Sequence, residues 1–371
     1  MMKSSLIRIS LFFILLVLFI PNFISAESKT FIKEYTYQAS DEDSKNSSRT
    51  IALREVKRLL LEELGTYLES ITEVQNFQLT KDLITTLTAG IVKTEIVAEK
   101  WNTDSLKYWL KARIVADTNE VIGSIDVLRK DREKTKELEE ARERSDELLK
   151  ENARLRKELT VSKGNKRQND VIAYNRTIRE LTATDWFEKG YSSGISGDYS
   201  YAIDAFSKAI ELNPENEHGY LARGYSYSKL GNYNQAIKDY DKSIALNPAN
   251  ANAYNNRGDA YKILKNYNQA IKNYSKAIEI SPQYANSYFI RGLIYDHLGN
   301  YNQAIMDYNK TIELDGGNAE AYYFRAAAIV KYYPLLNQQD IIYQAINDYK
   351  IAARLGLKAA QDYLKSRGYD W

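Results

Sequence analysis

The chain has 371 residues, of which 44% are hydrophobic and 27% are charged, a globular composition long enough for two or three domains. Lys and Arg number 51 against 49 Asp and Glu, so the net charge is near zero and a broad basic surface for nucleic acid is not expected. The sequence contains no cysteine, which excludes disulfides, thiolate metal sites and lipid attachment through an N-terminal cysteine.

The first 26 residues predict an export signal. Lys3 and Arg8 supply positive charge around the start of an unbroken apolar run over 11–20, and residues 24–26 (Ile-Ser-Ala) offer a cleavage site. The run is short for a membrane span. Because the first residue of the cleavage site is not small, an uncleaved segment that anchors the protein in a membrane is the alternative. We expect an exported protein, periplasmic or associated with the cell envelope.

Residues 27–124 predict a small α+β domain. The pattern contains strand-like alternation, helical periodicity and two alternating runs separated by four polar residues, which is typical of a hairpin. The expected elements are a strand over 30–38, a helix over 48–63 that stops at Gly65, a short helix after Thr80, and hairpin strands over 91–101 and 106–116.

The order of these elements over residues 30–117 resembles the N-terminal domain of flagellar-ring assembly proteins and related bacterial envelope lipoproteins. A helix over 79–90 leads into the hairpin strand that begins Ile91-Val92-Lys93, as in that domain. The resemblance rests on this pattern and implies no catalytic residues. An enzyme regulated by its C-terminal half would need a catalytic site in residues 27–125, and nothing in the sequence there indicates one.

Residues 125–160 predict a charged helix with a short coiled-coil seam. Its less polar positions alternate in steps of three and four, at Leu138, Ala141, Ser145, Leu148, Asn152, Leu155 and Leu159. A buried asparagine in such a seam costs stability while it fixes register and oligomeric state. We therefore expect a homo-oligomer formed through this coiled coil, with a lone solvated helix as the alternative. Residues 161–182 are predicted to be a linker, because 160–170 shows no apolar period.

Residues 183–371 repeat with a period of 34, which signals a stacked solenoid. A glycine inside a helix costs about 1 kcal/mol, so its recurrence indicates close approach of a neighbouring helix. An aromatic residue follows each repeated alanine by four positions and should fill the space between helices, and proline should end each second helix. The structural repeat positions are Gly190, Gly224, Gly258, Gly292, Ala202, Ala236, Ala270, Ala304, Pro214, Pro248 and Pro282.

These spacings resemble the tetratricopeptide repeat family, a helix-turn-helix array. The resemblance implies a mainly α chain that ends in an α-solenoid of five helix pairs and a capping helix over 358–365. The fifth unit departs from the pattern, because Gly316 replaces the proline and Ala326 replaces the glycine. An insertion predicted at 334–340 would lengthen the turn between its two helices. Such units are stable only when about three or more stack together.

In the tetratricopeptide family, partner peptides lie in the concave groove lined by the first helix of each unit. The resemblance carries this role to His218, Leu221, Tyr225, Ser228, Asn252, Asn255, Asp259, Lys262, Asn286, Phe289, Leu293, Asp296, Glu320, Tyr323, Ala327 and Val330. This mixed lining suits a peptide held by ring contacts and amide hydrogen bonds. Leu221, Asn255 and Phe289 stand where family members place the clamp for a C-terminal carboxylate, so a chaperone-tail receptor is not expected.

An arginine recurs directly before each repeated glycine position, and an acid or amide recurs with it. The two series are Arg223, Arg257, Arg291 and Arg325, and Asp239, Asn273, Asp307 and Asp348. We predict a structural ladder in which the arginine stems pack between helices and the heads pair at the surface. The alternative is that these arginines bind an anionic ligand.

The sequence predicts no catalytic, cofactor-binding or metal-binding residues. The histidines, His218 and His297, have no carboxylate at ligand spacing on the same turn, and no phosphate loop, metalloprotease motif or nucleophile elbow is present. We predict a non-enzymatic scaffold of the bacterial cell envelope that binds other proteins or peptide segments. Its layout is similar to periplasmic coordinators with a trimerising coiled coil ahead of tetratricopeptide repeats. A structural component of a secretion, polysaccharide-export or flagellar apparatus is the alternative.

Overall fold

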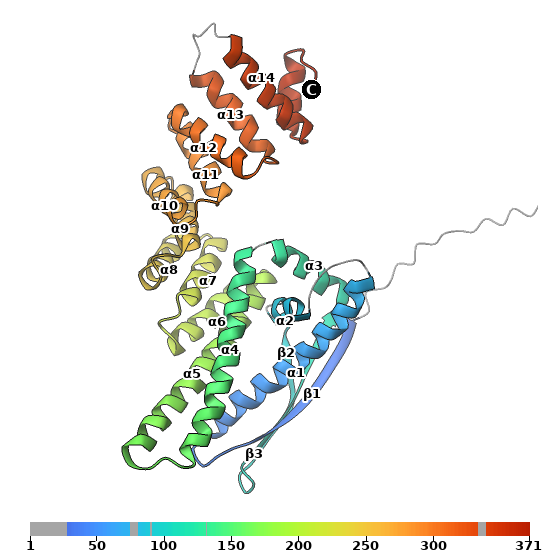
Figure 1. The fold of residues 1–371 in the computed structure, drawn as a ribbon, viewed down its shortest axis with the longest axis vertical. Coiled ribbons are helices and arrows are strands. Elements are labelled where there is room, and N and C mark those ends of the chain that lie inside the picture. Colours follow the sequence, from blue (N-terminus) through green and yellow to red (C-terminus); the bar gives the residue numbers. More distant parts are fainter. Residues whose placement is uncertain (1–27, 75–80, 90, 131, 333–338) are drawn as a thin grey trace, which may run out of the picture.

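The computed structural model describes residues 28–74, 81–89, 91–130, 132–332 and 339–371 (Figure 1). The signal predicted over 1–26 lies outside these residues. So does most of the predicted insertion over 334–340, of which Gln339 and Asp340 already belong to a helix. No helix within the described part of the chain is both long and apolar enough to cross a membrane.

The N-terminal region is a three-stranded antiparallel sheet with a long helix packed on one face. The strands are β1 (Ser28–Gln38), β2 (Thr94–Asn102) and β3 (Lys107–Asp117), in the order β1-β3-β2, so the predicted hairpin is confirmed. Alternate residues such as Phe31, Leu110 and Ile114 are buried, because successive side chains point to opposite faces of a strand. They pack against α1 (Lys45–Val74) and α2 (Lys81–Ala89) in a single core.

Helix α1 does not stop at Gly65, contrary to the prediction. Leu64 and Leu68 flank this glycine and are fully buried in the core. Burying a leucine contributes about 1.5–3 kcal/mol, whereas a glycine inside a helix costs about 1 kcal/mol. Packing of the residues after Gly65 therefore outweighs the local preference of the glycine, and the helix continues to Val74.

The predicted linker over 161–182 is wrong from Gly164 onward. Two helices, α3 (Thr118–Lys130) and α4 (Arg132–Leu159), are followed by a short turn and then by α5 (Gly164–Ile195). Tyr174, Thr177 and Leu181 are buried and lie on one face of α5. This apolar face begins beyond the polar stretch at 160–170, so the stretch is the exposed start of a helix and not a linker.

The predicted heptad seam of α4 packs against α5 of the same chain. Leu155 and Leu159 form a buried cluster with Tyr174 of α5. The buried Asn152 donates through Nδ2 to Thr177 Oγ1 at 3.2 Å. The seam is thus filled within one molecule by α5, and a homo-oligomer formed through it stays a prediction. A heptad pattern specifies that a helix has a partner but not which chain supplies it.

The C-terminal half is a stack of five helix pairs, as predicted, and it rises away from the N-terminal sheet in Figure 1. The first pair joins the end of α5 to α6 (Tyr199–Leu212), and α15 (Lys358–Ser366) covers the last pair through the buried Ala360 and Leu364. The remaining pairs are α7 (Glu217–Lys229) with α8 (Tyr233–Leu246), α9 (Ala251–Ile263) with α10 (Tyr267–Ile280), α11 (Ala285–His297) with α12 (Tyr301–Leu314), and α13 (Ala319–Tyr332) with α14 (Gln339–Arg354).

The repeated glycines allow a ring to lie directly against the helix backbone. A Cβ atom on Gly190 would stand 2.7 Å from the Phe206 ring, and one on Gly224 would stand 2.8 Å from the Tyr240 ring. Both distances are shorter than a van der Waals contact. The repeated alanines are fully buried beside these rings, and the prolines lie two residues beyond the second helix of each unit. The prediction that rings pack closely against the glycines and the prediction that the prolines follow the second helices are confirmed.

The arginine ladder is also confirmed as a structural feature, but the prediction that its heads pair at the surface is wrong, because the carboxylates of Asp239, Asp307 and Asp348 are buried between the helices. Arg291 on α11 grips Asp307 on α12 with two hydrogen bonds of 2.8 and 2.7 Å. Its third nitrogen donates to Ser275 on α10 of the preceding unit at 2.8 Å, so one side chain joins three helices. The same arrangement joins Arg223 to Asp239 and Ser207, and Arg325 to Asp348 and Asn309.

The remaining rung of this ladder has its carboxylate on the other neighbour. Arg257 donates to the neutral Asn273 within its own unit at 2.7 Å and pairs with Asp241 of the preceding unit. Each arginine in the ladder therefore has one carboxylate partner, although the position of that partner changes. Since the charges balance within every rung, the ladder offers no excess positive charge for an anionic ligand.

Candidate functional site

A concave cavity of about 750 Å³ opens between α3, α5, α7, α9 and α11. It crosses the first helices of consecutive units, as the predicted groove does. Its lining consists of Asn119, Glu120, Gly123, Ser124, Tyr191, Gly194, Ile195, Tyr199, Phe206, Leu221, Ala222, Tyr225, Ser226, Asn252, Asn255, Asn256, Asp259, Tyr284 and Asn286. Amides and aromatic rings dominate, and no Lys, Arg or His occurs among these described residues.

The structure brings six of the sixteen predicted groove residues into this cavity: Leu221, Tyr225, Asn252, Asn255, Asp259 and Asn286. Two others have different surroundings from those expected. Phe289 is buried in the core between the rings of Tyr308 and Phe324. His218 lies at the far side of α7, where Nε2 is 3.2 Å from a carboxylate oxygen of Glu140 on α4.

The surroundings of His218 correct two expectations from the sequence. This residue does not line the groove, and two carboxylates lie near its Nε2: that of its sequence neighbour Glu217 at 3.4 Å, and that of Glu140, because α4 folds back against the first repeats. A prediction based on one helical turn could not include Glu140, which lies far away in the sequence. Within the described residues, no group of three His, Asp or Glu side chains is arranged to hold a metal ion.

The other predicted groove residues lie outside this cavity. Asp296 and Lys331 form an ion pair of 2.8 Å, and Tyr323 packs edge-on against Tyr349 near the C-terminal end of the stack. Ser228 shares a hydrogen bond of 3.1 Å with the Tyr240 hydroxyl. The remaining predicted positions that do not line the cavity are Lys262, Leu293, Glu320, Ala327 and Val330.

Asn255 is the polar residue at the centre of the cavity wall. Its Oδ1 accepts a hydrogen bond of 2.7 Å from the Ser287 hydroxyl, which fixes the orientation of the amide. Its Nδ2 is buried and has no partner among the described residues. An unpaired buried donor costs about 1–3 kcal/mol, so a ligand carbonyl that paired with it would recover part of that cost. Beside it, the Tyr284 hydroxyl donates to Asn252 Oδ1 at 3.0 Å.

Asp259 is already engaged by neighbours within its unit. Its Oδ1 accepts from Lys262 Nζ at 3.0 Å and from the Tyr274 hydroxyl at 2.8 Å. Burial, together with this carboxylate, raises the pKa of Tyr274 far above its ordinary range, so the phenol remains a donor. Asp259 therefore contributes an oriented, largely neutralised carboxylate to the cavity wall.

The residues from α3 are a part of the cavity that the sequence analysis missed. Asn119, Glu120, Gly123 and Ser124 precede the repeats by about sixty residues of chain and belong to no recognisable motif. The N-terminal sheet carries them to the groove, since α3 follows β3 directly. Only the tertiary packing of the N-terminal region on α5 could have revealed them.

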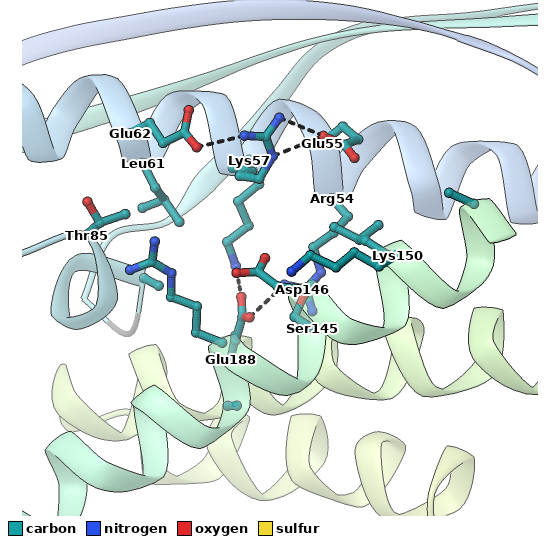
Figure 2. Close-up of a pocket in the computed structure, with 16 residues that line it drawn as sticks. Arg54, Glu55, Lys57, Leu61, Glu62, Thr85, Ser145, Asp146, Lys150 and Glu188 are labelled. Atoms are coloured by element: carbon teal, nitrogen blue, oxygen red, sulfur yellow. Dashed lines mark hydrogen bonds and ion pairs between the residues drawn. The ribbon is translucent and has the colours of Figure 1, made fainter. Parts of the chain in front are cut away.

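A second cavity, of about 500 Å³, lies between α1, α2, α4 and α5 and is strongly charged. Figure 2 shows Arg54 and Lys57 reaching from α1 toward Glu188 of α5. Arg54 Nη1 lies 2.6 Å from Glu188 Oε1 and 3.4 Å from Asp185 Oδ1, and Lys57 also pairs with Glu188. These side chains are almost completely buried, and they tie the N-terminal region to the first repeat.

Electrostatics identify Glu188 as the centre of this charged junction. Burial alone would raise its pKa, but the positive charges of Arg54 and Lys57 outweigh burial and lower the pKa of Glu188 to about 2. For Asp185, burial dominates and the pKa is raised in spite of Arg54. Since its best-placed cations already have carboxylate partners, we interpret this cavity as a structural junction.

Family models match the repeats of this chain. A model described as TPR repeat matches residues 195–231, 224–265 and 258–299, and one described as tetratricopeptide repeat matches 285–318. Together these matches span the second helix of the first unit to the end of α12. No curated protein sequence matches the chain.

Several solved structures resemble the solenoid. A MamA structure is 29% identical and covers 48% of this chain and 94% of its own, with a TM-score of 0.43. YrrB, described as a TPR protein with an unusual peptide-binding site, is 18% identical and covers 48% and 90%, with a TM-score of 0.41. The first TPR of Spaghetti, bound to an HSP90 peptide, is 28% identical and covers 32% and 95%, with a TM-score of 0.32.

Proposed function

Because residues 195–318 are tetratricopeptide repeats, we propose that the protein is a non-enzymatic scaffold that binds a peptide segment of a partner protein in the concave cavity. The observation that carries this proposal is the lining of that cavity. It crosses the first helices of the first three units and reaches the fourth, and it presents amides and rings where the structure leaves a buried donor without a partner.

The lining residues suit an extended peptide. Each residue of such a peptide offers one N–H and one C=O, spaced by about 3.3 Å along the chain. Asn255 Nδ2 can donate to a carbonyl, while Asn252 and Asn256 provide further amide groups along the same helix. The rings of Tyr199 and Tyr225 offer apolar faces for side chains of the peptide.

We further propose that this scaffold works in the bacterial cell envelope. The support comes from the sequence, in which a basic, apolar and cleavage-site pattern occupies the first 26 residues. A reporter enzyme that is active only after export, fused after residue 125, should be active in cells. The same fusion without residues 1–26 should be inactive, and equal activity of the two fusions would contradict export.

Site-specific photocrosslinking tests the peptide-binding proposal. A photoreactive phenylalanine analogue is introduced at Tyr225, which lines the cavity, and in a control variant at Tyr201, an exposed tyrosine on α6 outside it. We expect the analogue at 225 to crosslink in living cells to one contiguous segment of a partner, as mapped by mass spectrometry. We expect no such segment from position 201. Crosslinks that are the same at both positions would show that partners do not use the cavity.

A further inference from the structure

One wall of the cavity is made by α3, which lies outside the repeats. One side of α3 packs into the N-terminal core, and another side lines the cavity. Val121 and Ile125 point into the N-terminal core and are 4% and 1% exposed. Glu120, Gly123 and Ser124 lie on other positions of the same turns and line the cavity. The helix is therefore held from behind by the N-terminal core while its polar side faces the repeats.

The start of α3 is fixed relative to the sheet. Asp117 is the last residue of β3, and its Oδ1 accepts hydrogen bonds of 3.0 Å from the backbone N–H groups of Asn119 and Glu120. This N-terminal cap joins strand to helix without a flexible connection. The wall of the cavity is thus as well anchored as the sheet from which it extends.

The charged side chains that line the cavity are all negative. Its lining contains two carboxylates, Glu120 and Asp259, and no cationic side chain among the described residues. Asp259 is engaged by Lys262 and Tyr274, as described above. The Glu120 side chain is exposed and pairs with none of the described cations. A negative charge without a counter-charge therefore stands at the α3 end of the groove.

We propose that α3 and the repeats form one composite site, which selects peptide segments carrying a lysine or arginine whose charged head pairs with Glu120. This inference rests on the proposed peptide-binding function and adds the sign of the ligand's charge and the role of the N-terminal region. A segment whose acidic side chain or C-terminal carboxylate lies at this end is disfavoured, because no cation in the cavity lining would balance it.

Gly123 provides a way to test the wall without disturbing the fold. A Cβ atom added to this glycine would have no heavy atom within 4 Å, so a larger side chain would extend into open space. Gly123→Trp should therefore obstruct the α3 end of the cavity. Gly123→Ala is its control, since a methyl group leaves the cavity open and favours the helix.

The charge of the wall is tested with a matched pair of exposed glutamates. Glu120→Lys reverses the charge at the cavity. Glu215→Lys makes the same change in the turn between α6 and α7, on an exposed residue that does not line the cavity. Both variants change the net charge of the protein equally, so a difference between them reports position and not total charge.

Phage-displayed random peptides serve as the probe and are panned on the full chain, with fluorescence anisotropy of a labelled selected peptide as the readout. We expect selected peptides to be enriched in lysine and arginine, and replacing the key basic residue by glutamine to weaken binding about tenfold. Glu120→Lys should weaken binding about tenfold or more, and Gly123→Trp should abolish it. Glu215→Lys and Gly123→Ala should bind as the wild type does.

The other possible results contradict the composite site, the charge rule or the proposed function, as follows. If the selected peptides lose binding with Tyr225→Ala but bind Glu120→Lys and Gly123→Trp normally, the composite site is wrong and the proposed function stands. If random peptides yield no binder to the wild type, both fall. Peptides enriched in acidic residues would overturn the charge rule. Should Gly123→Trp fail to fold by circular dichroism, the exposed Glu120→Lys still decides.

Discussion

Arginine–carboxylate pairs hold helices together in two regions of this molecule, with different consequences. In the repeats, four arginines each join three helices, and in three of these rungs a partly exposed arginine holds a buried carboxylate. At the junction with the N-terminal region, one buried carboxylate, Glu188, serves both Arg54 and Lys57. A repeat array spreads its ion pairs over similar interfaces, whereas the junction concentrates two of its cations on one carboxylate. The comparison predicts large effects at the junction and graded effects along the ladder.

Replacing the central carboxylate of the junction should have the largest effect. Glu188→Gln removes the carboxylate that pairs with the buried Lys57 and leaves Arg54 with Asp185 alone, 3.4 Å away, which we expect to cost about 3–5 kcal/mol. We expect the free energy of unfolding, measured by urea denaturation with circular dichroism, to fall by about this amount. The matched control is Glu62→Gln on α1, because Glu62 pairs with Arg58 where both side chains are 43% exposed. There the expected loss is below about 1 kcal/mol. Equal losses would show that the buried cations find other partners.

Acid should weaken the ion pairs of Glu188 at the junction. The folded-state pKa of Glu188 is lowered to about 2 from an ordinary value of 4.5, so its stabilisation is present above pH 4.5 and is lost as the pH falls toward 2. The loss is at most about 3 kcal/mol. Asp185 acts in the opposite direction, because burial raises its pKa, and reduces the net loss.

One carboxylate of the ladder, Asp307, has the opposite sign in the same pH range. Burial raises the pKa of Asp307 in spite of Arg291, so protonation of this carboxylate favours the folded state as the pH falls. We expect wild-type stability, measured by urea denaturation from pH 7 to pH 3, to fall more steeply than that of Glu188→Gln. Parallel curves would mean that other carboxylates cause the acid sensitivity.

The difference between these two regions also explains what the sequence could predict. Ladder partners were found because arginine and its carboxylate recur with the period of the repeat, so four copies of one contact appear in a single chain. The glycine contacts were found in the same way, since Gly190 and Phe206 have equivalents in the next three units. The repeated units of one chain can thus be compared with each other, as related sequences are compared in an alignment.

The junction and the α3 wall occur once, so no period reveals them. Asp185 and Glu188 look like ordinary charged residues of a repeat until α1 is packed on α5. A separate contact, of α4 on α5, gives the seam of α4 its partner, and α5 begins at Gly164 within the polar stretch. Contacts between segments more than a hundred residues apart depend on tertiary arrangement, which local patterns do not encode.

The smallest loss of stability is expected in the ladder itself, at Arg257, whose carboxylate partner belongs to the preceding unit. Arg291→Ala leaves the buried Asp307 without its partner, which we expect to cost about 2–3 kcal/mol. Arg257→Ala leaves the neutral Asn273 and Asp241, whose side chain is 53% exposed and can be hydrated. Its loss should be about 1 kcal/mol. Thermal and urea denaturation of the two variants under one set of conditions measures the difference.

The same two variants test whether ring contacts, and not carboxylates, stabilise the ladder. Arg257 and Arg291 also lie over tyrosine rings, with guanidinium carbons 5.4 Å from the centre of Tyr254 and 5.7 Å from that of Tyr288. Arg291 also lies 5.9 Å from the centre of a second ring, Tyr295. If both alanine variants lost the same stability, the rings and arginine stems would hold the ladder. A larger loss at Arg291 that persists in a Tyr295→Leu background would assign the difference to its buried carboxylate.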